Sequence, residues 1–170
     1  MIKITVGDKD FEIHPISQCD LDAVLEVYKQ CEDFLALGPV PTASMEMVFK
    51  DIEVSKGKDG RFCGIYAING TMIGIIDYVP NGYNGSPNTA FLELLMIALP
   101  FRNQGIGKAV VAAIEKELIE ETEVRTIFSA VQVNNPHAIE FWRLNGYRII
   151  SGPDLQPDQT IVFGLCKELT

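Results

Sequence analysis

Two spacings of hydrophobic residues alternate along this chain, and they predict strands and helices in a regular order. Strands are expected where apolar residues form short runs or alternate with polar ones, and helices where they recur at every third or fourth position. The predicted strands are 2–6, 11–16, 61–68, 71–79, a run that begins at 91, 126–133, 147–150 and 159–166. The predicted helices are 20–31, one that starts after Ser44, 105–121, and one that starts at Asn135–Pro136 and ends at Asn145–Gly146.

Turn-forming residues separate these elements. Asn69–Gly70, between two predicted strands, is a strong signal for a tight hairpin. The segments Glu32–Thr42 and Pro80–Asn88 are rich in glycine, proline or asparagine, so both are expected to be exposed loops. A loop containing Pro153 and Pro157 is expected before the last strand. Hairpins followed by strand, helix, strand, helix and strand predict a single α/β domain, with helices on both faces of one mixed sheet.

The segment Phe91–Val111 combines an apolar strand, a turn and a helix. Glu93 is the one charged residue in its apolar run. A helix that starts directly after such a turn presents free backbone N–H groups at the positive end of its dipole, which favours an anion. Gly105 and Gly107 have no Cβ atom, so a phosphate could approach the backbone closely. The segment is therefore predicted to bind an anion.

Two common phosphate-binding motifs do not fit this segment. A P-loop needs glycine five residues before its Gly–Lys pair and Ser or Thr after it, but Arg102 and Ala109 occupy those positions around Gly107–Lys108. A dinucleotide fingerprint needs a third glycine, and Val110 stands there. A nucleotide-binding protein is therefore a remote alternative.

The pattern Arg102-x-x-Gly105-x-Gly107 after a strand resembles the acyl-CoA pyrophosphate loop of the GCN5-related N-acetyltransferase (GNAT) superfamily. A second segment, 133–147, is similar to the fourth-helix motif of that family. The matching residues there are Asn135, Ala138, Gly146 and Tyr147. The resemblance implies one GNAT domain over residues 1–170, with a mixed, mostly antiparallel sheet of about seven strands and helices on both faces.

The resemblance also implies where the acyl donor, acetyl-CoA, would bind. In this family the pantetheine arm lies between the strand before the loop and the strand before the fourth helix, and the pyrophosphate meets the loop. Carried over, the cofactor-binding residues are Met96, Ile97, Leu99, Arg102, Asn103, Gln104, Gly105, Ile106, Gly107, Lys108, Asn135 and Trp142. No metal is implied.

Glu93 stands where the histone-type members of the family carry their general base. The resemblance implies that it takes the proton that an ammonium acceptor must lose before it attacks the thioester. An apolar environment can raise the pKa of a carboxyl group toward neutrality, which suits this role. A glutamate at a strand end in solvent, without a catalytic role, is an equal alternative.

Trp142 departs from the family pattern, because many relatives carry a tyrosine there that protonates the leaving thiolate. An indole N–H donates a hydrogen bond but not a proton. A thiol with a pKa of about 8.5 is nevertheless a fairly good leaving group without assistance. His137 is expected to face solvent, and Tyr147 is expected to pack into the core rather than act as the acid.

Composition and charge exclude several classes of protein. A net charge of −9 disfavours nucleic acid as a partner. The absence of a long apolar run and of a secretory signal predicts a cytoplasmic protein without a membrane span. The four scattered cysteines are expected to be buried reduced thiols: Cys19, Cys31, Cys63 and Cys166. The acidic run Glu115–Glu123 is expected to be a solvated helix face.

These observations predict an enzyme that transfers the acetyl (acyl) group of acetyl-CoA to a primary amine of a small molecule or peptide by direct attack, as a monomer or homodimer. The alternative is a catalytically silent acyl-CoA-binding regulatory module, which would explain Trp142. The acceptor pocket is expected between the loops 32–42 and 80–88 and the helix near 45–49. Its polar candidates are Asp33, Asp77, Tyr78 and Tyr83, and the acidic balance favours a cationic amine.

Overall fold

The computed structural model describes all residues 1–170, which form one eight-stranded sheet in the order β1-β2-β3-β4-β5-β6-β8-β7. The strands are β1 (Ile2–Val6), β2 (Lys9–Pro15), β3 (Arg61–Ala67), β4 (Met72–Val79), β5 (Thr89–Ile97), β6 (Thr126–Gln132), β7 (Arg148–Leu155) and β8 (Ile161–Glu168). Only β5 and β6 pair in parallel. The prediction of a mixed, mostly antiparallel sheet is confirmed, with eight strands instead of about seven.

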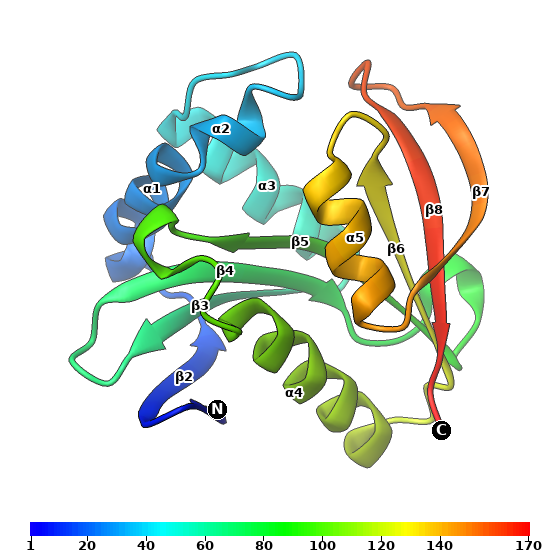
Figure 1. Ribbon diagram of the computed structural model, residues 1–170, viewed down its shortest axis with the longest axis horizontal. Helices are drawn as coiled ribbons and strands as arrows, with labels where there is room; N and C mark the ends of the chain where they lie inside the picture. The colour runs from blue at the N-terminus through cyan, green and yellow to red at the C-terminus, as the bar shows by residue number, and fades with distance from the viewer.

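Helices cover both faces of this sheet (Figure 1). The α-helices are α1 (Leu21–Gln30), α2 (Glu32–Leu35), α3 (Met45–Gly57), α4 (Ile106–Glu121) and α5 (Pro136–Leu144). Single 3₁₀ turns, η1 (Gln18–Asp20), η2 (Tyr83–Gly85) and η3 (Leu99–Phe101), connect other elements. Helices α1 to α3 lie on one face and α4 and α5 on the other, so the sheet is the middle layer.

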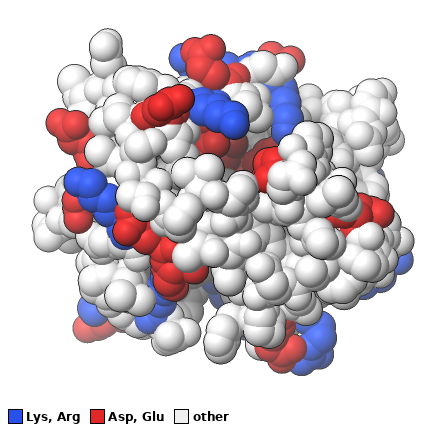
Figure 2. Space-filling model, turned by 90° about the horizontal axis from the view of Figure 1, so that it is seen from above, with Lys and Arg blue, Asp and Glu red and all other residues white.

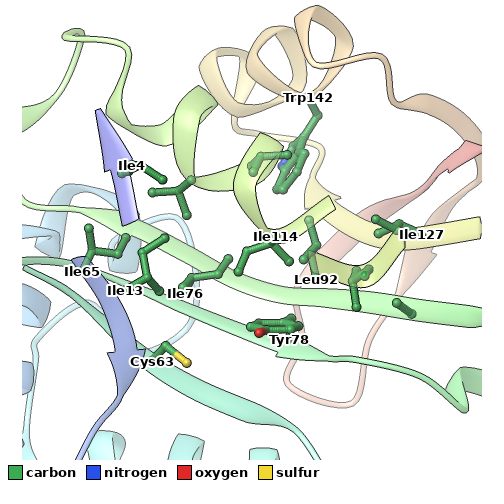
Figure 3. Close-up of a cluster of buried hydrophobic side chains, with 14 of the residues drawn as sticks. Ile4, Ile13, Cys63, Ile65, Ile76, Tyr78, Leu92, Ile114, Ile127 and Trp142 are labelled. Atoms are coloured by element: carbon green, nitrogen blue, oxygen red, sulfur yellow. The ribbon is translucent and has the colours of Figure 1, made fainter. Parts of the chain in front are cut away.

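Each face of the sheet has its own hydrophobic core. The larger core joins the α4 face to the strands and includes Ile114 of α4 and Leu92 of β5, both almost fully buried (Figure 3). The smaller core packs α1 and α3 against the opposite face, through residues such as Val24 and Val48. Because β4 is buried along its whole length, it belongs to both cores.

The sheet opens between its two parallel strands. Pairing of β5 with β6 runs from Thr89–Thr126 to Leu92–Ser129 and then stops, although β5 continues to Ile97 and β6 to Gln132. Past that point β5 stays paired only with β4, and β6 only with β8. Figure 1 shows β5 and β6 running in different directions, with α5 beside them. The two strands therefore form a V whose closed end lies at Leu92 and Ser129.

Several local predictions are confirmed, and others need correction at their ends. The hairpin at Asn69–Gly70 joins β3 and β4, and Ser44 caps α3 by accepting a hydrogen bond from the Met47 N–H at 3.2 Å. The predicted loop 32–42 contains the short helix α2. The predicted loop at Pro153 is instead part of β7. Because β7 is an edge strand, the missing N–H of a proline is tolerated there.

The expectation of a fully solvated acidic face on α4 is wrong for two glutamates. The side chain of Glu115 is 12% exposed and pairs with Lys167, and that of Glu117 is 14% exposed and pairs with Arg61. These glutamates face cations on neighbouring strands. Three of the cysteines are buried free thiols as predicted, whereas Cys19 is exposed.

Charged residues on the face seen in Figure 2 are mixed. Lysine and arginine atoms lie mostly beside aspartate and glutamate atoms, and they form no extended basic area on that face (Figure 2). This agrees with the net charge of −9. None of the helices combines the length and the apolar character that a membrane crossing requires.

Candidate functional site

The turn before α4 presents a run of free backbone N–H groups. Those of residues 103–108 have no hydrogen-bond acceptor within the protein. Asn103 (φ 59°) and Gly105 (φ 83°) both adopt the left-handed conformation, which glycine and asparagine accept more readily than other residues. Because α4 extends for 16 residues behind this turn, its dipole adds positive potential. The turn therefore fits an anion such as a pyrophosphate.

Side chains around this turn divide into exposed and buried ones. Asn103, Gln104 and Lys108 are exposed, so the Lys108 ammonium is free to meet an anion at the helix N-terminus. Ile106 is 2% exposed and packs into the larger core, so only its backbone faces the turn. A Cβ atom at Gly107 would lie 3.3 Å from the ring of Phe141, so this glycine lets α5 approach α4 closely.

Arg102 does not point into the free turn. Its Nη1 and Nη2 atoms donate to the two carboxylate oxygens of Asp33 at 2.6 and 3.0 Å, and its Nε donates to the Ile97 carbonyl at 2.7 Å. The bonded guanidinium lowers the pKa of Asp33 below its usual range. Arg102 thus ties the segment after α1 to the end of β5. A phosphate could reach this guanidinium only if the ion pair opened.

Beyond Leu92, one edge of β5 has no neighbouring strand, and only every second residue directs its backbone N–H and C=O groups toward that edge. The Ala98 N–H donates to the Ile73 carbonyl of β4 at 2.8 Å, and Met96 lies opposite Ile75 two residues earlier. In an antiparallel ladder the polar groups of alternate residues face opposite neighbours, so those of Met96 face β4. Leu95 and Ile97 therefore face the V. The backbone groups of Leu95, a residue that the resemblance did not single out, therefore face the V, whereas those of the predicted Met96 do not.

Glu93 is the extra residue of a β-bulge at the closed end of the V. Leu92 lies opposite Tyr78 of β4, and Leu94 lies opposite Asp77, so Glu93 has no partner. A bulge redirects the side chain that it carries. The Glu93 side chain is 21% exposed, and its Oε1 lies 2.5 Å from the Nζ of Lys58, directly after α3. Glu93 is therefore neither free in solvent nor enclosed by apolar residues.

A second carboxyl group, Asp77, lies buried beside Glu93. It is 5% exposed, and its Oδ1 accepts a hydrogen bond from the Ser55 hydroxyl at 2.6 Å. Burial raises the pKa of Asp77 to about 6, and the charge of Glu93 adds to this increase. On the same side, Asp51 accepts a hydrogen bond from the Tyr28 hydroxyl at 2.7 Å. Acidic side chains thus lie beside the bulge, on the side of the sheet that α3 covers.

Residues of α5 mainly hold that helix in place. The Asn135 side chain accepts a hydrogen bond from the Ala138 N–H at 3.1 Å and so caps α5. Trp142 is 8% exposed in the larger core, edge-on to the Tyr147 ring. Tyr147 is buried as predicted, and its hydroxyl donates to Glu115 at 3.0 Å. His137 is exposed, as predicted.

The segment 32–44 crosses the open end of the V. At its start Asp33 binds Arg102, which follows β5, and further along the Leu37 carbonyl accepts a hydrogen bond from Asn134, which follows β6, at 3.1 Å. Leu99 begins the 3₁₀ turn directly before Arg102 and is 62% exposed. The segment is therefore placed to form one wall of a site between these strands. In contrast, Tyr83 packs against Phe91 near the closed end, with the two rings tilted relative to each other.

Comparison with known proteins relates the chain to acetyltransferases. The family model described as "Acetyltransferase (GNAT) family" matches residues 21–147. A search of curated protein sequences finds no significant match.

Similar solved structures cover almost the whole fold. An acetyltransferase from Thermus thermophilus has a TM-score of 0.76 and 18% identity, covering 99% of this chain and 100% of its own. A spermidine N-acetyltransferase from Vibrio cholerae, in complex with CoA and spermine, has a TM-score of 0.72 and 12% identity, with coverage of 94% and 95%. The PaiA N-acetyltransferase from Thermoplasma acidophilum, in complex with coenzyme A, has a TM-score of 0.68 and 21% identity, with coverage of 93% and 98%.

Reversing the charge of Lys108 should weaken CoA binding. Lys108→Glu replaces a cation at the free N–H groups with an anion, and loss of one charge-assisted contact corresponds to a roughly ten-fold or greater rise in Kd. Isothermal titration calorimetry with CoA measures this change in Kd. The matched control is Lys116→Glu, since Lys116 is exposed on the same helix. The affinity of this variant for CoA should stay nearly unchanged. Equal affinities for the two variants would contradict the assignment of this turn.

The raised pKa of Asp77 should make folding stability depend on pH. The folded protein holds this proton more tightly than the unfolded chain does, so the contribution of Asp77 to the free energy of unfolding should fall as pH rises from 3.8 to about 6. Asp77→Asn keeps an acceptor for Ser55 but removes the titration. Urea unfolding across this range should show the variant gaining on the order of 2 kcal/mol relative to wild type. Curves of unfolding free energy against pH that run parallel for Asp77→Asn and wild type would refute the prediction.

Proposed function

Because the chain belongs to the acetyltransferase (GNAT) family, we propose that it transfers the acetyl group of acetyl-CoA to a primary amine of a small molecule or peptide. The observation that carries this proposal is the position of Glu93: a bulge places a carboxylate where β5 and β6 part. Free backbone N–H groups lie at the other end of the same opening. One site thus offers a base and an anion-binding turn.

Binding of the acyl donor would use backbone more than side chains. The N–H groups of residues 103–108 and the Lys108 ammonium would hold the pyrophosphate, because they are unpaired and at the positive end of α4. The polar groups of Leu95 and the N–H of Ile97 would bind the pantetheine amides, as an extended ligand does at a strand edge. Backbone groups of this kind also orient the thioester, and orientation alone lowers the barrier substantially.

Transfer would proceed by direct attack of the amine on the thioester, without a covalent enzyme intermediate. An ammonium acceptor must first lose a proton, and Glu93 is the proposed base because it lies at the closed end of the V. Lys58 must move aside for an acceptor to reach it, because the two side chains are in contact at 2.5 Å. Asp77 lies behind Glu93 and adds negative charge, which supports a cationic acceptor.

The leaving thiolate would depart without a tyrosine acid. Trp142 stands at the family's tyrosine position but is buried in the core, and indole does not release a proton at ordinary pH. Tyr147 donates its hydroxyl to Glu115 and is also part of the core. Water would therefore protonate the thiolate, whose conjugate acid has a pKa of about 8.5.

A catalytically silent acyl-CoA-binding module is the second candidate, and Trp142 is the observation that favours it. Both candidates retain the anion-binding turn and differ only in turnover. A screen of amines with acetyl-CoA, in which a thiol reagent detects released CoA, separates them. Spermidine belongs in that screen, because a similar fold is found in a spermidine N-acetyltransferase. Turnover with any amine supports the enzyme, whereas CoA binding without turnover supports the silent module.

Glu93→Gln should lower kcat while leaving CoA affinity nearly unchanged. Loss of one general base costs about 100-fold or more in rate. The matched control is Glu12→Gln, which neutralises another strand glutamate paired with a lysine. Its kcat should equal that of wild type. Full activity of Glu93→Gln at every pH would assign Glu93 a structural role only.

A further inference from the structure

Lys58 occupies the position that an acceptor amine must take. Its Nζ lies 2.5 Å from the Oε1 of Glu93, and its side chain is 48% exposed. Lys58 directly follows α3, so it reaches Glu93 from the α1–α3 side of the sheet, opposite α4 and α5. A lysine ammonium is itself a primary amine on a flexible alkyl chain. It therefore presents the reacting group of a substrate to the proposed base.

The acidic groups around Glu93 favour this position of the lysine. Asp77 of β4 lies behind the bulge, bonded to Ser55, and Asp51 of α3 lies on the same side, bonded to Tyr28. The charges of Glu93 and Asp51 act on Asp77 to disfavour its ionised form, while Lys58 acts in the opposite sense. Lys58 is the cation that offsets Glu93 and Asp77, and Lys50 acts on Asp51 in the same sense. The electrostatic field thus attracts one ammonium to Glu93.

The contact between Lys58 and Glu93 lies at the place along the sheet where a bound thioester would react. Glu93 follows Leu92, the last residue of β5 that pairs with β6. A thioester placed between the separating strands would have its reactive end at this closed end of the V. Lys58 would then lie beside both the base and the acyl group, which is the arrangement that makes an intramolecular reaction fast.

We propose that Lys58 is an acetylation site of the protein itself, modified in its own active site; this proposal rests on the proposed function. Glu93 accepts one proton from the Lys58 ammonium, and the freed nitrogen lone pair forms the N–C bond with the thioester carbonyl carbon. The C–S bond breaks, and its electron pair leaves with the sulfur of CoA. The second nitrogen proton goes to that thiolate through water, and Glu93 releases its proton to solvent.

Acetylation changes what the site can bind. The product at Lys58 is a neutral amide, which no longer forms an ion pair with Glu93. Glu93 and the buried Asp77 then lack their neighbouring cation, so a second ammonium group gains access to them. The acceptor class that fits is a primary amine on an unbranched alkyl chain, the chemistry that Lys58 itself supplies.

The test is incubation of the purified full chain with acetyl-CoA, followed by peptide mass spectrometry. Lys58 should gain one acetyl group about ten-fold or more faster than Lys56, an exposed lysine in the last turn of α3 that has no partner at the bulge. Because the reaction is intramolecular, its first-order rate should not depend on protein concentration. Glu93→Gln should slow the modification of Lys58 by about 100-fold and leave that of Lys56 unchanged.

Controls separate this proposal from the proposed function. Urea-unfolded protein reports the chemical reactivity of each lysine with acetyl-CoA alone, and Lys56→Arg should leave the modification of Lys58 unaffected. If the protein binds CoA and acetylates an added amine, but Lys58 reacts no faster than Lys56, the self-acetylation proposal is overturned and the proposed function stands. If the protein binds no CoA, both fail. Equal modification of Lys58 in wild type and Glu93→Gln also overturns the proposal.

Discussion

The geometry of the candidate site depends on the point at which β5 and β6 stop pairing. A buried backbone carbonyl must find a hydrogen-bond partner, and the Ser129 hydroxyl supplies one to the Leu92 carbonyl at 2.9 Å, at the last paired position. The strands can therefore separate there without leaving this group unpaired. Farther along, Arg102 binds the Ile97 carbonyl. Between these two points the edge of β5 presents backbone groups without a neighbouring strand, and this is where an extended ligand would bind.

The same separation organises the polar groups around it. The bulge at Glu93 begins where pairing stops, so the carboxylate is redirected toward the α1–α3 side, where Lys58 and the buried Asp77 lie. At the opposite end, hydrogen bonds from Arg102 to Asp33 and from Asn134 to Leu37 hold the segment 32–44 across both strands. The proposed base, the turn with free N–H groups and the segment 32–44 are thus all positioned by one feature of the sheet.

Much of the fold could be predicted from the sequence, because its signals are local. The Asn69–Gly70 hairpin, the Ser44 cap and the turn before α4 each depend on neighbouring residues and lie where they were predicted. The site was less predictable, since its contacts join distant parts of the chain. Glu93 could be selected from the resemblance, but neither its bulge nor Lys58, 35 residues away, has a sequence signature. For the same reason, the sequence predicts Arg102 as a pyrophosphate ligand but gives no sign of its ion pair with Asp33.

We infer that acetyl-CoA lies between the separating strands with its thioester beside Glu93. A crystal structure with a non-hydrolysable acetyl-CoA analogue tests this most directly. We expect the pantetheine amides to form hydrogen bonds with Leu95 and Ile97, the pyrophosphate to contact residues 103–108, and the acyl carbonyl to lie next to Glu93. A pantetheine arm outside the V, for example in the surface hollow lined by Val6, Lys9 and Gln104, would contradict it.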